Sequence, residues 1–146
     1  MTFTEPVVRV LEQMQTNGLE PHHLAAEAIA TWSKAQRLQP KPEPKTSKGF
    51  AVSFHVKGLP DWATPFKMFS NGKGLIPVSH LRRHRPFNSE TIEKELIVRM
   101  EKAPGKWKMN SDFPEVDLGT LDEAGVTELC TILDFIQSEV RRIHTH

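Results

Sequence analysis

The sequence contains a single cysteine, Cys130, no tyrosine and no long apolar run. One thiol excludes an intrachain disulfide framework and gives no cysteine-based zinc site, which fits a reducing compartment. Residues 1–13 carry Glu5 and Arg9 and have no long apolar stretch, so they predict neither a secretory signal nor a membrane anchor. We therefore expect a cytoplasmic protein without a membrane partner.

Catalytic motifs are also missing. The sequence has no glycine-rich phosphate-binding loop, no Gly-x-Ser-x-Gly elbow and no His-Glu-x-x-His pattern. His80 and His84 have the four-residue spacing of metal ligands on a helix, but Arg82, Arg83 and Arg85 beside them disfavour a further positive charge. The sequence thus predicts neither an enzyme nor a site for a cofactor or metal.

The composition is that of a globular chain, and its charge is unevenly spread. The chain has 146 residues, of which 38% are hydrophobic and 25% charged, with a net charge of +1, which is typical of one ordinary domain. Residues 49–89 hold six lysines and arginines against the single acid Asp61, whereas residues 112–146 hold eight acids against Arg141 and Arg142. The basic middle and the acidic end either pack against each other or serve two partners.

Residues 1–38 predict a helical hairpin. Apolar residues recur at helical spacing on both sides of Asn17-Gly18, whose glycine accepts the left-handed conformation of a helix end. The second helix has one apolar stripe, formed by Leu24, Ala25, Ala28, Ile29 and Trp32. Residues 39–48, QPKPEPKTSK, alternate proline with charge and predict a Pro-rich linker of the polyproline type; a proline-motif docking site is the alternative. The linker leads to an α+β domain at 49–146.

Several strands are predicted in that domain. In residues 50–56, Phe50, Val52, Phe54 and Val56 alternate with Ala51, Ser53 and His55, which predicts one buried and one exposed face. Residues 66–69 and 74–78 flank Asn71-Gly72, a strong hairpin signal. Residues 107–109 form a further strand after a turn. Residues 91–102 fit both a strand and a helix, and we favour a strand because a turn-like Ala-Pro-Gly follows.

The C-terminal segment predicts a long helix. Thr120 and Glu123 fit a capping box, and apolar residues continue at helical spacing to Ile143. The fold class is therefore α+β: an N-terminal helical hairpin, a Pro-rich linker, and an antiparallel sheet of four or five strands with a long C-terminal helix packed on it.

The basic middle of the chain suggests a small nucleic-acid-binding accessory or regulatory protein. Cations that track a phosphate backbone, interleaved with rings that stack on bases, are typical of single-strand binding. Phe69 is a further candidate for stacking. The expected nucleic-acid-binding residues are Lys67, Lys73, Arg82, Arg83, Arg85, Lys106, Trp107 and Lys108.

A resemblance points the same way. The order of an antiparallel sheet and a long last helix is similar to that of single-stranded-DNA-binding transcriptional coactivators of the positive-cofactor type, and residues 106–142 resemble their last strand and helix. No motif matches residue by residue, so no site is carried over. The alternative function is a protein–protein interaction module, an adaptor or inhibitor, that docks through the helical hairpin or the acidic C-terminal helix. A homodimer is left open.

Overall fold

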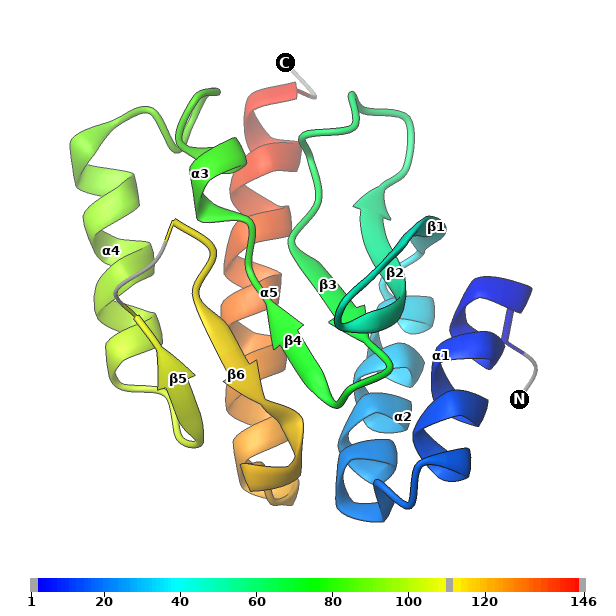
Figure 1. Cartoon of the computed structure of the whole chain (residues 1–146). Helices are drawn as coiled ribbons and strands as arrows, with labels where there is room; N and C mark the ends of the chain where they lie inside the picture. The colour runs from blue at the N-terminus through cyan, green and yellow to red at the C-terminus, as the bar shows by residue number, and fades with distance from the viewer. Residues whose placement is uncertain (1–2, 110–111, 145–146) are drawn as a thin grey trace.

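The computed structural model describes residues 3–109 and 112–144, and it shows an antiparallel sheet with helices on one face (Figure 1). The helices are α1 (Glu5–Thr16), α2 (Glu20–Ala35), α3 (Val78–Leu81), α4 (Glu90–Glu101) and α5 (Glu123–His144), with a short 3-10 turn η1 (Leu118–Thr120). The strands are β1 (Leu38–Thr46), β2 (Gly49–Val56), β3 (Phe66–Phe69), β4 (Lys73–Leu75), β5 (Lys106–Lys108) and β6 (Glu115–Asp117). Helices α2 and α5 run side by side behind the sheet.

The predicted α+β class is confirmed, with one more strand than expected. The sheet has six strands in the order β1-β2-β3-β4-β6-β5, and all neighbouring pairs are antiparallel. Apolar residues of α1 and α2, such as Val10 and Ile29, share one buried core with Val52 and Phe54 of β2. No helix in the described part of the chain is long and apolar enough to cross a bilayer.

The proline-rich residues 39–48 are not an unpaired linker, because most of them form the edge strand β1. Pro40 lies opposite Phe54, and Pro42 lies opposite Val52. In an antiparallel edge strand every second N–H points away from its neighbour, so prolines at alternate positions remove no bond from the ladder. The same prolines leave the outer edge without donors for another strand. The division into units at 1–38 and 49–146 stays a prediction.

The strand expected at residues 91–102 is also wrong, because this segment is helix α4. Leu96 and Met100 are both fully buried at four-residue spacing, and α4 packs on α5. Val98, which a strand would place on the same face as Leu96, is 38% exposed. Lys94 and Glu95, directly before Leu96, are exposed, so the helical period fits the burial where the strand period does not.

Two local details differ from expectation. Strand β2 is covered on both faces, since Ser53 and His55, expected outside, are buried; the loop after β2 folds back, and its Leu59 carbonyl lies 2.7 Å from the His55 ring. The long last helix is confirmed, but Asp122 caps it by accepting from the Gly125 N–H at 2.8 Å. The Thr120 hydroxyl instead donates to the Asp117 carbonyl at 2.6 Å.

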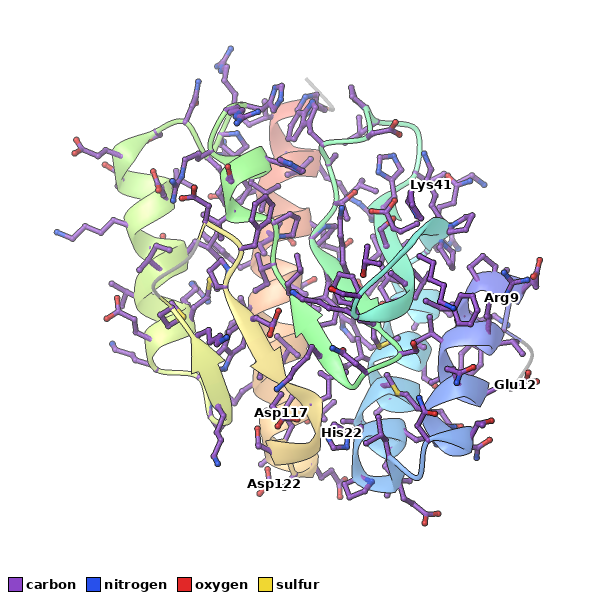
Figure 2. The ribbon with its side chains drawn as sticks, in the orientation of Figure 1. Arg9, Glu12, His22, Lys41, Asp117 and Asp122 are labelled. Carbon is purple, nitrogen blue, oxygen red and sulfur yellow. The ribbon has the colours of Figure 1, made fainter. Side chains whose placement is uncertain are left out.

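Helix α2 is tied to the end of the sheet by the ring of His22 (Figure 2). His22 Nε2 lies 2.9 Å from Asp117 Oδ1, and the ring fits between Gly72 and Gly119. A Cβ added at Gly72 would lie 2.3 Å from the ring, and one at Gly119 would lie 2.4 Å from it. These two glycines therefore leave the space that the imidazole occupies.

We expect Gly119→Ala to destabilise the chain by about 1–3 kcal/mol, the range for overpacking a filled site. Because Gly119 has no positive φ, the cost comes from contact with His22 and should largely vanish in a His22→Ala background. Urea unfolding of the two single variants and the double variant measures this coupling.

The matched control is Gly72→Ala, which contacts the same ring but has a φ of +91°. Its backbone strain should persist at about 1 kcal/mol after His22 is removed. Strictly additive effects of Gly119→Ala and His22→Ala on the free energy of unfolding would contradict the close fit of the His22 ring against Gly119.

Candidate functional site

Four of the predicted lysines lie on one face of the sheet. Lys106 of β5 is opposite Asp117 of β6, which is in turn opposite Lys73 of β4. Lys67 and Lys108 follow on the same side, because side chains alternate along each strand and the register aligns them. This side, opposite α2 and α5, is called the open face below (Figure 1). The structure therefore brings Lys67, Lys73, Lys106 and Lys108 together.

Carboxylates interrupt this basic surface. Lys67 Nζ lies 2.6 Å from Glu43 Oε1, and Lys73 Nζ lies 3.6 Å from Asp117 Oδ2. Glu115 faces Lys108 across the β5–β6 pair and also pairs with Lys48. The open face is thus a mixed-charge surface, on which two of the four predicted lysines are already neutralised.

The three predicted arginines follow α3 and differ in their surroundings. Arg82 is held between Glu93 and Asp112, with N–O distances of 3.0 Å to each. Arg83 and Arg85 are exposed and form no ion pair within residues 3–109 and 112–144. Arg83 lines a pocket together with Lys67, whereas Arg85 does not.

The two aromatic residues expected to stack on bases are placed differently. Trp107 lies opposite Val116 and packs against the core, on the side away from the lysines. Its Nε1–H donates to the Pro104 carbonyl at 3.1 Å. Phe69 is on the open face but only 7% exposed, with Lys48 Nζ 5.2 Å from its ring centre. Neither ring lies uncovered beside the predicted lysines.

An apolar groove with a volume of about 870 Å³ lies between α2 and α5. Leu24, Ala28 and Trp32 line it from α2 at four-residue spacing, and Val126 and Cys130 line it from α5. Leu24 is 65% exposed, the most exposed large apolar side chain in the described chain. Leu24 and Ala28 are therefore on a side of α2 that the core does not cover, and Trp32, which packs partly against the core, lies at its end.

Acidic side chains surround this α2/α5 groove. Asp122 and Glu123 line it at the start of α5, and Asp134 lines it three turns later. Asp134 Oδ1 accepts from Gln137 Nε2 at 3.1 Å, which fixes its position. No lysine or arginine of residues 3–109 and 112–144 lines the groove. It therefore combines an apolar floor with an acidic rim.

Sequence reasoning found the groove residues but not the groove. The apolar stripe of α2, which includes Leu24, Ala28 and Trp32, is expected from the sequence to pack on the rest of the chain or on another copy. The structure buries Ala25 and Ile29 instead and leaves Leu24 exposed. The available signal was that Ala26 and Ala30, outside this stripe, are also apolar, so α2 has more apolar positions than one packed face covers.

Cys130 lies at the floor of the α2/α5 groove, and burial raises the pKa of its thiol to about 12. The thiolate is the reactive form of cysteine.

We expect iodoacetamide to alkylate the native chain at pH 8 roughly a thousandfold more slowly than the urea-unfolded chain, because the thiolate fraction falls by that factor. Mass spectrometry measures the extent of alkylation, and because Cys130 is the single cysteine in the sequence, the mass increase reports on its thiol. Equal rates in both states would show that Cys130 is accessible and ionised.

Comparison with known proteins does not assign this chain to a family. No protein-family model matches the chain, and neither a curated protein nor a solved structure matches it. The resemblance to single-stranded-DNA-binding coactivators gains no support from these comparisons. The geometry of the groove and of the open face therefore has to distinguish an interaction module from a nucleic-acid-binding protein.

Proposed function

We propose that this chain is a protein-interaction module whose α2/α5 groove binds a basic amphipathic helix of a partner protein. The observation that carries this proposal is the apolar groove, whose lining holds three carboxylates and, among the residues that the structure describes, no lysine or arginine. Helix-in-groove recognition uses apolar anchors at i, i+3 or i+4, and i+7. Leu24, Ala28 and Trp32, at positions i, i+4 and i+8 along α2, offer apolar contacts to such anchors.

The dimensions of the groove suit a helix of several turns. Helix α2 has 16 residues, which at about 1.5 Å per residue is about 24 Å, or more than four turns. Each apolar side chain buried fully from water contributes about 1.5–3 kcal/mol. Three or four anchors contribute about 5–12 kcal/mol, from which the cost of association has to be subtracted. Micromolar affinity, which needs about 8 kcal/mol, therefore also requires attraction between the rim carboxylates and cations of the partner.

The rim charges favour a partner over a second copy of this chain. Asp122, Glu123 and Asp134 would bring acidic rims into close proximity if two such grooves packed together. Like charges at an interface disfavour the pairing, whereas lysines or arginines flanking the apolar stripe of a partner helix are attracted to the same rim. The partner expected here is therefore a helix with an apolar face bordered by cations.

The test uses the full chain and an 18-residue helical peptide with leucines on one face and lysines elsewhere. We expect micromolar binding that weakens with salt and no binding of a matched peptide with glutamate in place of lysine. Ala28→Arg places a cation in the centre of the groove and should reduce the affinity at least tenfold. Isothermal titration calorimetry measures each affinity.

Gln15→Arg is the matched control, because Gln15 is exposed on α1 and does not line the groove. It should leave peptide binding unchanged, and circular dichroism should show both variants folded. Equal binding by the two arginine variants would refute the groove as the site. A dimer that Ala28→Arg dissociates would instead assign the groove to a second copy.

Nucleic-acid binding is the second candidate function, and the four lysines on the open face favour it. Lys106 and Lys108 are exposed on the edge strand β5 and form no ion pair with a described residue. They are the lysines of this face best able to contact phosphates. Glu115 and Asp117 between the strands oppose the approach of a polyanion.

If the open face binds nucleic acid, the affinity for a labelled single strand should fall steeply between 50 and 200 mM salt, in proportion to the phosphates contacted. Lys106→Gln with Lys108→Gln should weaken binding at low salt and flatten this slope by about 1–2, since each phosphate contact adds about 0.7–0.9. Fluorescence anisotropy measures both. Lys94→Gln with Lys102→Gln, at exposed positions in α4 and directly after it, is the control. No binding at 50 mM salt excludes this candidate.

A further inference from the structure

A second, polar pocket lies at the end of the open face, away from the α2/α5 groove. It has a volume of about 520 Å³ and is formed by β1, β2, the loop at residues 57–65, β3 and the segment of α3 that continues to His84. Lys41, labelled in Figure 2, marks its β1 side. This polar pocket shares no lining residue with the groove.

The floor of the polar pocket is a fixed set of buried polar groups. Ser53, His55 and Thr64 are all nearly inaccessible to solvent. The Thr64 hydroxyl donates to the Asp61 carbonyl at 2.9 Å, and His55 Nε2 lies 2.7 Å from the Leu59 carbonyl. Protein groups therefore hold this floor in place.

The charged side chains that line the polar pocket include one cation without a carboxylate partner among the described residues. Lys41 Nζ pairs with Asp61 Oδ1 at 2.9 Å, and Lys67 Nζ pairs with Glu43 Oε1 at 2.6 Å. These two pairs account for both carboxylates that line the pocket. Arg83 also lines it and forms no ion pair or side-chain hydrogen bond with a described residue. The uncompensated charge at this site is therefore positive.

Two histidines present ring nitrogens at the same place. The His84 ring stacks on Trp62, with centroids 4.3 Å apart and planes 8° from parallel. The His80 ring meets the edge of Phe113 with centroids 5.2 Å apart. Ring contacts hold both imidazoles, and neither ring forms a hydrogen bond among the described residues. Their nitrogens are thus left to a ligand or to water.

We infer that this polar pocket binds a small phosphomonoester, with Arg83, Lys67 and His80 contacting the phosphate and the Trp62–His84 stack contacting the organic part. The guanidinium of arginine presents two parallel N–H donors to a phosphate. Lys67 of β3 and His80 of α3 add further donors. Because these donors come from separate elements and different directions, they suit a tetrahedral oxyanion better than a flat carboxylate. Trp62 supplies an aromatic surface for an apolar or planar group.

The electrostatics around His80 agree with an anion at this place. Burial lowers the pKa of His80, the charges of Lys67 and Arg83 lower it further, and Glu43 opposes them only in part. A bound phosphate would offset those cations and favour the protonated ring. His80 would then donate to the phosphate from a site that is otherwise positive.

Phenyl phosphate is the probe, with inorganic phosphate, benzoate and phenol for comparison. We expect phenyl phosphate to bind most tightly, inorganic phosphate and benzoate more weakly, and phenol not measurably. Titration calorimetry gives the affinities, and the His80 and His84 ring signals in NMR spectra locate the site. Benzoate binding more tightly than phenyl phosphate would overturn the phosphomonoester assignment.

Arg83→Gln should weaken phenyl phosphate at least tenfold, and the matched Arg85→Gln should leave it unchanged. Both arginines are exposed, and only Arg83 lines the polar pocket. Equal effects of the two variants would overturn the proposal. Displacement of phenyl phosphate by a single-stranded oligonucleotide that binds more tightly and depends on Arg83 would assign the pocket to nucleic acid instead.

Discussion

The fit of His22 between Gly72 and Gly119 is the constraint on which the arrangement of the helices depends. The ring comes from α2, one glycine lies in the β3–β4 turn and the other lies in η1, directly before α5. Burial raises the pKa of Asp117, but the Gly119 N–H, Lys73 and His22 outweigh it and hold that pKa below its ordinary value. One carboxylate therefore connects the helical hairpin, the sheet and the entry to the last helix.

This connection fixes the spacing of α2 and α5, and with it the α2/α5 groove. Because η1 positions the start of α5, the same contact sets how far Leu24 and Val126 stand apart across the groove. The two sides of the sheet then differ in chemistry. On the helical side, the α2/α5 groove has an apolar floor lined by carboxylates. On the open face, the charged side chains are mostly paired, and the polar pocket at its end contains Arg83, His80 and His84. The two sites have no lining residue in common among the described residues, so the ligands proposed for them would not compete directly.

Local patterns predicted the elements whose neighbours in sequence determine them. Alternation in residues 50–56 and the Asn71-Gly72 turn predicted strands, and the apolar period after Glu123 predicted the last helix. The strand β1 could not be read this way, because its prolines are tolerated only by the edge position that the completed sheet provides. Helix α4 had two compatible periods, and packing against α5 decided between them. The His22–Asp117 pair joins residues far apart in sequence, so no local pattern indicates it.

Contacts between residues far apart in sequence also bear on which anion the open face could bind, a polynucleotide or a small phosphate. The sequence correctly indicated a basic segment, but the carboxylates that accompany it come from β1 and β6, which lie elsewhere in the chain. A polynucleotide that crosses the sheet must pass Glu115 and Asp117, which are themselves paired with Lys48 and Lys73. A small phosphate in the polar pocket meets only Glu43 and Asp61, each already paired with a lysine. Lysines therefore pair with the carboxylates on both routes. The cations without an ion pair to a described residue, Arg83 at the polar pocket and Lys106 and Lys108 on β5, are what distinguish a site for a compact anion from one for a polymeric anion.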